Sequence, residues 1–312
     1  MKNQTTSLPS PSFEIERAPR ALGQFDYYAQ HSQAASYDNH PVKYDFFEPD
    51  ISQNDDPTPI LINNGYCAPA IVYDALAIGL AQNGRRVIRI HPPRCVSLGR
   101  RFFGGHVTNP LKKHAQAAWA VTKHASQEFG FDQIDTLGHS MGTPISLMLA
   151  AEKPQAVRSV MCTGGAGLDG AGGFIAMSAK GAALLKHEVY DERAKIGAIG
   201  DRNAVGREVA RHILSHPLDT LAEGYYVSRA NATPSLRRAR AAGVLVGALL
   251  FEKDSFFKAD AVLRHIGSEL DYSVVIPDAK HIHPQLYPTE HAREQVEAFA
   301  ALNTPRFRNS AA

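Results

Sequence analysis

The sequence has few residues that form covalent cross-links. It contains three cysteines among 312 residues, Cys67, Cys95 and Cys162, and no Cys-x-x-Cys pair. Three scattered cysteines exclude a disulfide framework and a cysteine zinc site, and an odd number fits a reducing compartment. A chain of this length can instead bury one large hydrophobic core, with or without an inserted smaller domain.

Long hydrophobic runs and an excess of one charge are also missing. The first 20 residues lack the apolar stretch of a secretory signal. No window of about 18 uncharged apolar residues is present to span a bilayer. Lys and Arg number 33 against 31 for Asp and Glu, a balance that gives no electrostatic reason to bind nucleic acid or an anionic membrane. We expect a cytoplasmic protein with no membrane span and no nucleic-acid partner.

Strand and helix patterns alternate through most of the chain. Short apolar, β-branched runs predict strands over residues 60–62, 85–90, 133–138, 157–164, 243–251 and 272–277, with weaker candidates at 25–28 and 42–47. Helical periodicity covers residues 73–84, 109–130, 143–154, 258–270 and 288–303. This alternation predicts an α/β fold, a mainly parallel, doubly wound sheet with helices on both faces.

The alternation stops between residues 164 and 240. This segment begins with a glycine-rich stretch and contains helical patterns at 204–217 and 219–230, without a convincing strand. We predict a helical lid over residues 164–240, inserted into a core formed by residues 21–163 and 241–312. Residues 1–20 are polar and contain proline, which predicts a loose N-terminal tail.

The sequence "TLGHSMGT" places Ser140 between two glycines, Gly138 and Gly142. A strand pattern ends directly before the serine and a helical pattern follows it. A sharp strand-to-helix turn strains the central backbone and brings two backbones together, which leaves no room for side chains two residues to either side. The pattern therefore predicts Ser140 as a nucleophile, with its hydroxyl at the mouth of the sheet beside a helix N-terminus. The alternative is a serine helix cap with incidental glycines.

A serine hydroxyl needs a base and an orienting acid to become a nucleophile. Asp254 follows the strand at 243–251, and His281 follows the last strand. The order Ser, Asp, His along the chain is typical of a hydrolase built on such a sheet. Asp169 and Asp278 are alternatives for the acid, and His283 for the base.

With these residues in place, the chain resembles lid-bearing members of the α/β-hydrolase superfamily, of the esterase and lipase kind, over about residues 40–305. The segment "EKD" resembles the acid segment of that family, and "DAKHIHPQLYPTE" resembles its histidine segment, with Lys280 where glycine is usual. The resemblance implies two oxyanion donors, the backbone N–H groups of Met141 and Tyr66, with Cys67 as the alternative to Tyr66. The family commonly has His-Gly where this chain has Asn64-Gly65.

Four further residues are candidates for the substrate pocket: Cys67, His139, His283 and Tyr225. No cofactor is expected. His212 and His216 are four residues apart on a predicted helix, but no third ligand occurs at a recognisable spacing, so we predict no metal site.

These features predict a serine hydrolase that cleaves a small-to-medium carboxylic ester, thioester or lactone through an acyl-enzyme on Ser140. The same resemblance implies that bulky tertiary-alcohol esters are less expected as substrates, because the oxyanion turn contains a single glycine. A carbon–carbon bond hydrolase and an acyltransferase would use the same triad. A ligand-binding receptor on the same fold is an alternative of another class. Oligomeric state is not readable from the sequence.

Overall fold

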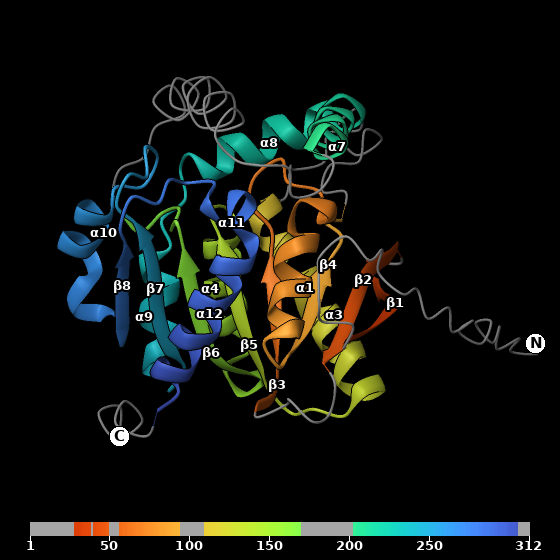
Figure 1. Cartoon of the computed structure of the whole chain (residues 1–312), viewed down its shortest axis with the longest axis horizontal. Coiled ribbons are helices and arrows are strands. Elements are labelled where there is room, and N and C mark those ends of the chain that lie inside the picture. The colour runs from red at the N-terminus through yellow and green to blue at the C-terminus, as the bar shows by residue number, and fades with distance from the viewer. Residues whose placement is uncertain (1–27, 39, 50–55, 94–108, 170–201, 305–312) are drawn as a thin grey trace, which may run out of the picture.

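The computed structural model describes residues 28–38, 40–49, 56–93, 109–169 and 202–304 (Figure 1). Its centre is an eight-stranded sheet with the spatial order β1-β2-β4-β3-β5-β6-β7-β8. The strands are β1 (Tyr28–Tyr37), β2 (His40–Pro49), β3 (Asp56–Asn63), β4 (Arg85–Ile90), β5 (Ile134–His139), β6 (Val157–Thr163), β7 (Leu245–Phe251) and β8 (Tyr272–Ile276). β2 runs antiparallel to β1 and β4, and every other neighbouring pair is parallel, which confirms the mainly parallel sheet.

Helices cover both faces of this sheet, and the sheet separates the two largest hydrophobic clusters of the described residues. One cluster packs beneath α1 (Asp74–Gln82) and α12 (Pro288–Leu302). The other packs beneath α3 (Pro110–Phe129), α4 (Gly142–Glu152), α9 (Thr233–Ala241) and α10 (Ala259–Ile266). The short elements are η2 (Ala70–Tyr73), η3 (Pro154–Ala156), η5 (Gly267–Glu269) and α11 (His283–Leu286). The two layers of helices explain why the central strands are apolar throughout: β5 and β7 are buried at every position.

Local sequence signals set the ends of the long helix α3. The Asn109 side chain accepts a hydrogen bond from the N–H of Leu111 at 2.9 Å, and Pro110 occupies the first turn. Gly130 ends the helix with a φ of +66°, a left-handed conformation that glycine adopts without a Cβ penalty.

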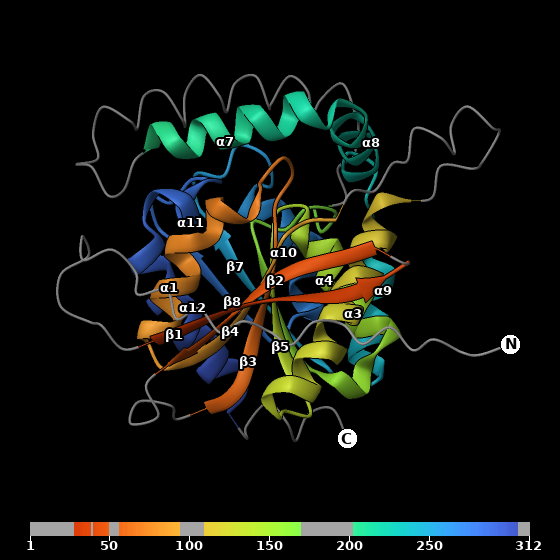
Figure 2. The same ribbon diagram turned by 90° about the vertical axis from the view of Figure 1, so that its right-hand side faces the viewer.

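The segment expected as a lid contributes three described helices, of which two lie across the carboxyl edge of the sheet. Figures 1 and 2 both show α7 (Arg202–Ser215) and α8 (Pro217–Val227) above this edge. α9, which the sequence pattern does not predict, packs instead against α4, and its Leu236 and Ala239 belong to the main core. Residues 170–201 lie outside the described part of the chain, as does the expected tail at 1–20.

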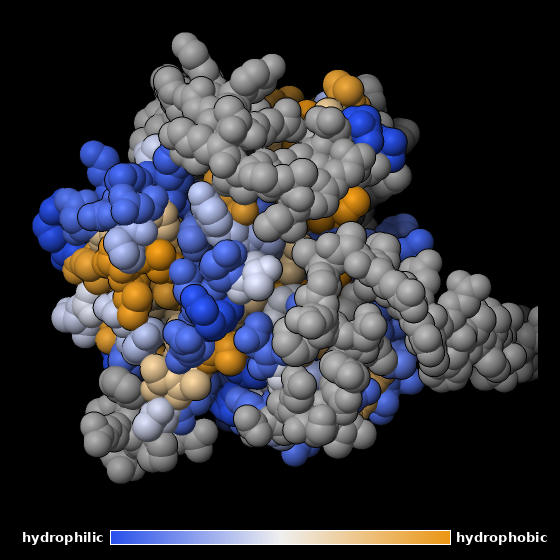
Figure 3. Space-filling view, in the orientation of Figure 1, coloured by the Kyte–Doolittle hydropathy of each residue, from blue (hydrophilic) through white to orange (hydrophobic). Residues whose placement is uncertain are grey.

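The two edges of the sheet differ from the interior. β1 pairs with β2 as an antiparallel hairpin along its whole length, although its sequence, YAQHSQAASY, is mostly polar. The sequence pattern predicts only a short strand near its start. At the other edge β8 pairs with β7 alone, and hydrophobic side chains gather over this side of the molecule (Figure 3). Val274 and Val275 of β8 are both more than a third exposed.

Across the described ranges, no helix combines the length and the hydrophobicity that crossing a bilayer demands.

A buried ion-pair network lies at the amino end of β5, the strand that leads to Ser140. Asp135 is fully buried, and its carboxylate accepts hydrogen bonds from Arg85 at 2.7 Å, Arg158 at 2.9 Å and Ser159 at 2.6 Å. These partners come from β4 and β6, so the network joins three strands at one end of the sheet.

We expect Asp135→Ala to lower the free energy of unfolding by about 3 kcal/mol, because it leaves the guanidinium groups of Arg85 and Arg158 with only the partly exposed Asp56 as a charged partner. Asp260→Ala is the matched control, since its ion pair with Arg264 is exposed and joins neighbouring turns of one helix. Urea denaturation monitored by circular dichroism measures both. Equal, small losses for the two variants would contradict the structural role of the network.

Candidate active site

Ser140 lies in a strained turn between β5 and α4. Its φ of +53° is in the left-handed region, which a residue with a side chain rarely adopts. The Ser140 N–H donates to the carbonyl of Thr163 on β6 at 2.9 Å, and its own carbonyl accepts from the N–H of Thr143 at 3.0 Å. These bonds hold the turn in place at the carboxyl end of the sheet.

The two flanking glycines allow the backbones around this turn to touch. A Cβ at Gly138 would lie 2.7 Å from the Cα of Thr143, and one at Gly142 would lie 2.7 Å from the carbonyl carbon of Asn63. Both separations are shorter than real Cβ contacts. Strand β5, helix α4 and the end of β3 therefore approach closely because these positions carry no side chain.

Three side chains expected to act together form one hydrogen-bonded chain. His281 Nδ1 lies 2.9 Å from Asp254 Oδ2, and His281 Nε2 lies 3.1 Å from Ser140 Oγ. A carboxylate only accepts, so Nδ1 carries the proton and Nε2 is left to accept from the serine hydroxyl. All three residues are at most 7% exposed. A hydroxyl, an imidazole and a carboxylate linked in this order can act as nucleophile, base and orienting acid.

The segment after β7 holds Asp254 and packs against the imidazole. Asp254 Oδ1 accepts from the N–H groups of Phe256 at 2.7 Å and Phe257 at 2.9 Å, which leaves Oδ2 for His281. The two phenyl rings lie 4.9 and 5.5 Å from the imidazole, centroid to centroid. Gly164 lies on the opposite side, where a Cβ would come within 3.2 Å of His281 Nδ1.

The alternative acids lie elsewhere. Asp278 is exposed at the surface and forms an ion pair with Lys253. Asp169 is half-buried in the loop that follows β6. The carboxylate that the structure places 2.9 Å from the His281 imidazole is that of Asp254.

His139 links three segments of the site through a buried hydrogen-bond chain. Its Nε2–H donates to the His281 carbonyl at 3.0 Å, so its Nδ1 accepts from the Tyr73 hydroxyl at 2.7 Å. The Tyr73 oxygen in turn accepts from the N–H of Gly65 at 2.8 Å. Burial, followed by the proximity of His281, holds the pKa of His139 well below its usual range, so the imidazole is neutral. The sequence does not identify Tyr73 as a site residue, because Tyr73 is far from Ser140 along the chain and its hydrogen bond to His139 forms only in the folded protein.

The turn after β3 lies against the residue before Ser140, since a Cβ at Gly65 would come within 3.5 Å of the His139 carbonyl oxygen. The N–H of Gly65 is bonded to Tyr73, whereas those of Tyr66 and Met141 have no hydrogen-bond partner within the described residues. The side chain of Tyr66 points away toward α8, where its hydroxyl donates to the carbonyl of Thr220 at 2.9 Å. Cys67, the next residue, has a φ of +55°, and burial raises the pKa of its thiol to about 11.

A narrow cleft opens beside Met141. It has about 20 Å³ of free space, room for roughly one water molecule. Its lining residues are Asn63, Asn64, Ile90, Pro92, Pro93, His114, Met141 and Ile145. His114 pairs with Glu223 of α8 at 2.9 Å, both buried, so α8 closes over this side of the cleft.

Two of the other pocket candidates lie away from Ser140. The Tyr225 ring is packed between Tyr226 and Arg229 and is 42% exposed. His283 pairs with Glu294 of α12 at 3.1 Å. His283, His291 and Glu294 together form a group that the sequence analysis did not anticipate, because the ligand spacings it considered do not join two helices.

Comparisons with known proteins agree with this architecture. A sequence profile described as the alpha/beta hydrolase fold matches residues 58–231. A search of curated proteins finds no significant match. Among solved structures, the chain is similar to a putative lipase from Acinetobacter baumannii (TM-score 0.64, 14% identity, 88% of this chain and 92% of that chain). It is also similar to a thermophilic esterase from Thermogutta terrifontis (0.58, 14%, 88% and 99%) and to a proline iminopeptidase from Mycobacterium smegmatis (0.61, 16%, 90% and 100%). At these identities the likeness concerns the fold alone.

We expect stability to fall as the pH is lowered through about 6.5, because unfolded His139 binds a proton there while folded His139 does not. Below this pH, the proton that only the unfolded state binds at His139 lowers the free energy of unfolding by up to about 1.4 kcal/mol per pH unit. Urea denaturation at several pH values measures the slope, which should be shallower for His139→Gln and unchanged for the control His265→Gln on the surface. A wild-type slope in His139→Gln would contradict the neutral buried imidazole.

Proposed function

Because the chain belongs to the α/β-hydrolase fold family, we propose that it is a serine hydrolase with Ser140 as nucleophile, His281 as base and Asp254 as orienting acid. The observation that carries the proposal is the hydrogen-bonded chain from Ser140 Oγ through His281 to Asp254, at the tip of a strained turn. The substrate class we infer is a small-to-medium carboxylic ester, thioester or lactone.

The mechanism follows from the direction of these hydrogen bonds. Ser140 Oγ attacks the acyl carbon while its proton passes to His281 Nε2. The imidazolium that forms is stabilised by the Asp254 carboxylate on Nδ1. The same proton then goes to the leaving alcohol or thiol, which departs and leaves an acyl-enzyme. Water, deprotonated by the neutral His281, hydrolyses that ester and regenerates the serine.

The negative charge on the tetrahedral intermediate needs two donors. We assign the N–H groups of Tyr66 and Met141 to this role, since they flank Ser140 and form no hydrogen bond with any described residue. The N–H of Gly65 is already bonded to the Tyr73 hydroxyl, and the N–H of Cys67 is the alternative to that of Tyr66. Tyr73 and His139 act as positioning residues, because they tie the turn that carries Tyr66 to the loop that carries His281.

The cleft beside Met141 is the candidate binding site for one part of the substrate. Its walls are mostly apolar, and Asn64 Oδ1 is buried there without a partner in the described part of the chain. A buried acceptor of this kind favours a substrate with a hydrogen-bond donor near the reacting carbonyl. Since the free space holds about one water molecule, substrate entry requires side chains of α8 or of the cleft to move.

We expect a fluorophosphonate probe to label Ser140 and p-nitrophenyl esters of short acyl chains to be hydrolysed. Ser140→Ala should abolish labelling. Asp254→Asn should lower turnover by roughly 10⁴-fold, because the imidazole loses its orienting acid. Asp169→Asn and Asp278→Asn are the matched controls, with turnover near the wild-type value.

Labelling at another serine would contradict the assignment of Ser140 as the nucleophile. No labelling in the folded protein would favour a ligand-binding receptor. If Asp169→Asn had strongly reduced turnover and Asp254→Asn had nearly normal turnover, the orienting acid would instead be Asp169, in the loop after β6. Added alcohol acceptors and carbon–carbon bond substrates in the same assay separate hydrolysis from acyl transfer and from carbon–carbon cleavage.

Helices α7 and α8 are assigned the role of a lid that selects substrates. Tyr226 and Val227 of α8 pack against a cluster that contains Met141 and Ile145 of the cleft. By contrast, Leu214 of α7 and Leu221 of α8 are 79% and 60% exposed. The side chains that can contact substrate are therefore on the face of α8 that carries Val227.

We expect Val227→Ala to shift the preferred acyl-chain length, with a change in relative kcat/KM of about 1–3 kcal/mol between short and long chains. Leu214→Ser is the exposed control and should keep the wild-type profile. Fluorophosphonate labelling of Ser140 should persist in both variants, because no proposed catalytic group lies in α7 or α8. Loss of labelling in folded Val227→Ala would mean that α8 supplies part of the catalytic machinery.

A further inference from the structure

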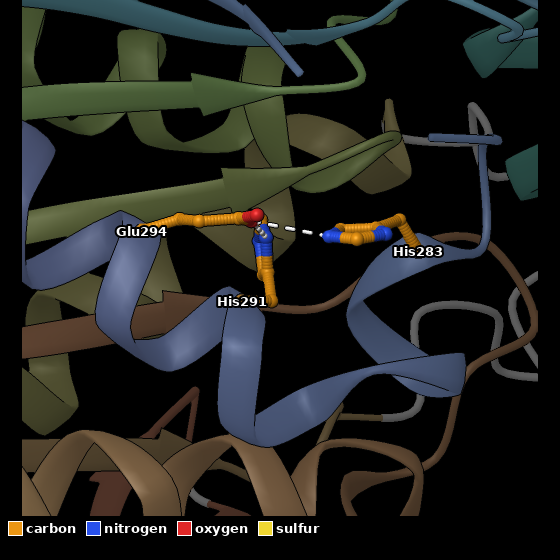
Figure 4. Close-up of side chains that lie close together, drawn as sticks. All are labelled: His283, His291 and Glu294. Carbon is orange, nitrogen blue, oxygen red and sulfur yellow. Dashed lines mark hydrogen bonds and ion pairs between the residues drawn. The ribbon is translucent and has the colours of Figure 1, made fainter. Parts of the chain in front are cut away.

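Two imidazoles and one carboxylate converge at a point behind the loop that carries His281. His283 lies on α11, and His291 and Glu294 lie on α12 (Figure 4). His283 Nε2 is 3.1 Å and His291 Nδ1 is 3.0 Å from the same oxygen, Glu294 Oε2. One ligand atom from each residue lies within 4.8 Å of the other two. We propose that His283, His291 and Glu294 bind a divalent cation of the zinc type.

The separations suit such an ion. In tetrahedral coordination with metal–ligand distances of about 2.0–2.1 Å, neighbouring ligand atoms are about 3.3 Å apart. The two nitrogen-to-oxygen separations here are shorter than this by 0.2–0.3 Å. A bound cation would therefore need each of these two pairs to separate by only that amount. Two imidazoles and one carboxylate also form a ligand set that zinc accepts, with a fourth position left for water.

The surroundings combine burial with access. His291 is fully buried and His283 is 9% exposed, whereas the Glu294 side chain is a quarter exposed. A cavity with about 40 Å³ of free space touches His283. Its other lining residues are Asp278, Lys280, Leu286 and Tyr287. This cavity supplies a path for the ion and space for a bound water molecule.

The hydrogen bond at His291 Nε2 determines whether the proton lies on Nε2 and the Nδ1 lone pair can bind a metal. Gln295 Nε2 lies 2.9 Å from His291 Nε2 and 2.8 Å from Thr163 Oγ1, while Gln295 Oε1 is buried without a partner among the described residues. With the amide turned over, Oε1 would accept hydrogen bonds from the His291 Nε2–H and the Thr163 hydroxyl. His291 then carries its proton on Nε2 and presents the Nδ1 lone pair, which is the orientation that a metal-bound histidine needs. This change moves the His291 proton from Nδ1 to Nε2 and leaves the imidazole neutral.

The competing arrangement is a hydrogen-bonded group without metal, in which both imidazoles donate N–H to Glu294 Oε2. That arrangement gives the same atoms their hydrogen-bond partners, and a cation does not bind there. The two arrangements differ in a direct measurement of metal binding to the full-length protein, after treatment with EDTA and dialysis.

We expect one equivalent of Zn²⁺ to bind and to raise the melting temperature by about 5 °C at a 100-fold excess over Kd. Co²⁺, used as a spectroscopic probe, should give the visible absorption of a four-coordinate site. Glu294→Gln removes the charged ligand and keeps its shape, and His283→Asn removes one imidazole near the surface. Both variants should lose the Zn²⁺-dependent shift and the Co²⁺ spectrum while their metal-free far-ultraviolet spectra stay unchanged.

The control is His216→Asn, because His212 and His216 form another close histidine pair, with ring centroids 5.0 Å apart, at the junction of α7 and α8 and outside the proposed catalytic groups. This variant should bind Zn²⁺ and Co²⁺ like the wild type. The absence of a shift in the wild type, an equal shift in folded Glu294→Gln, or loss of binding in His216→Asn would each overturn the proposal. Labelling of Ser140 is not part of this test, so its outcome is independent of the proposed hydrolase activity.

Discussion

The close approach of three backbone segments at Ser140 is the constraint on which the rest of the site depends. The end of β3, the end of β5 and the start of α4 touch where Gly138 and Gly142 lack side chains. The serine between them takes a left-handed conformation, and its N–H is held by Thr163 of the neighbouring strand. Strain of this kind persists only where the surroundings over-determine it, and here two parallel strands and a helix N-terminus do so.

Loops then bring the remaining groups to this fixed point. The carboxylate of Asp254 is oriented by two backbone N–H groups of its own loop, and the imidazole of His281 lies between that carboxylate and the serine. His139 holds the His281 loop by donating a hydrogen bond to the His281 carbonyl. Its other nitrogen is linked to the turn after β3 through the Tyr73 hydroxyl. Because His139 is buried and neutral, its Nε2–H donates to the His281 carbonyl and its Nδ1 accepts from the Tyr73 hydroxyl, with the amide of Gln285 as a more distant neighbour of Nδ1 at 3.4 Å.

The loop that carries His281 is held from its far side as well. Two residues further along the chain, His283 pairs with Glu294 of α12, which also pairs with His291. Gln295 of the same helix is bonded to Thr163, whose carbonyl fixes the Ser140 turn. A cation at the proposed site would therefore strengthen a connection that already runs from α12 to the serine turn. The cleft beside Met141, closed by α8 through His114 and Glu223, lies on the other side of the serine.

The sequence by itself determined the class of the fold and the order of its strands and helices, because apolar periodicity and glycine positions are local properties. It also pointed to Ser140, Asp254 and His281, since each follows a recognisable strand. It did not predict the polar strand β1, whose pairing with β2 overrides a weak local preference, nor helix α9. Tyr73, the exposure of Leu214 and the grouping of His283 with His291 and Glu294 were decided by the tertiary structure alone. Those features depend on which surfaces meet when distant segments pack, and no local pattern in the chain records that.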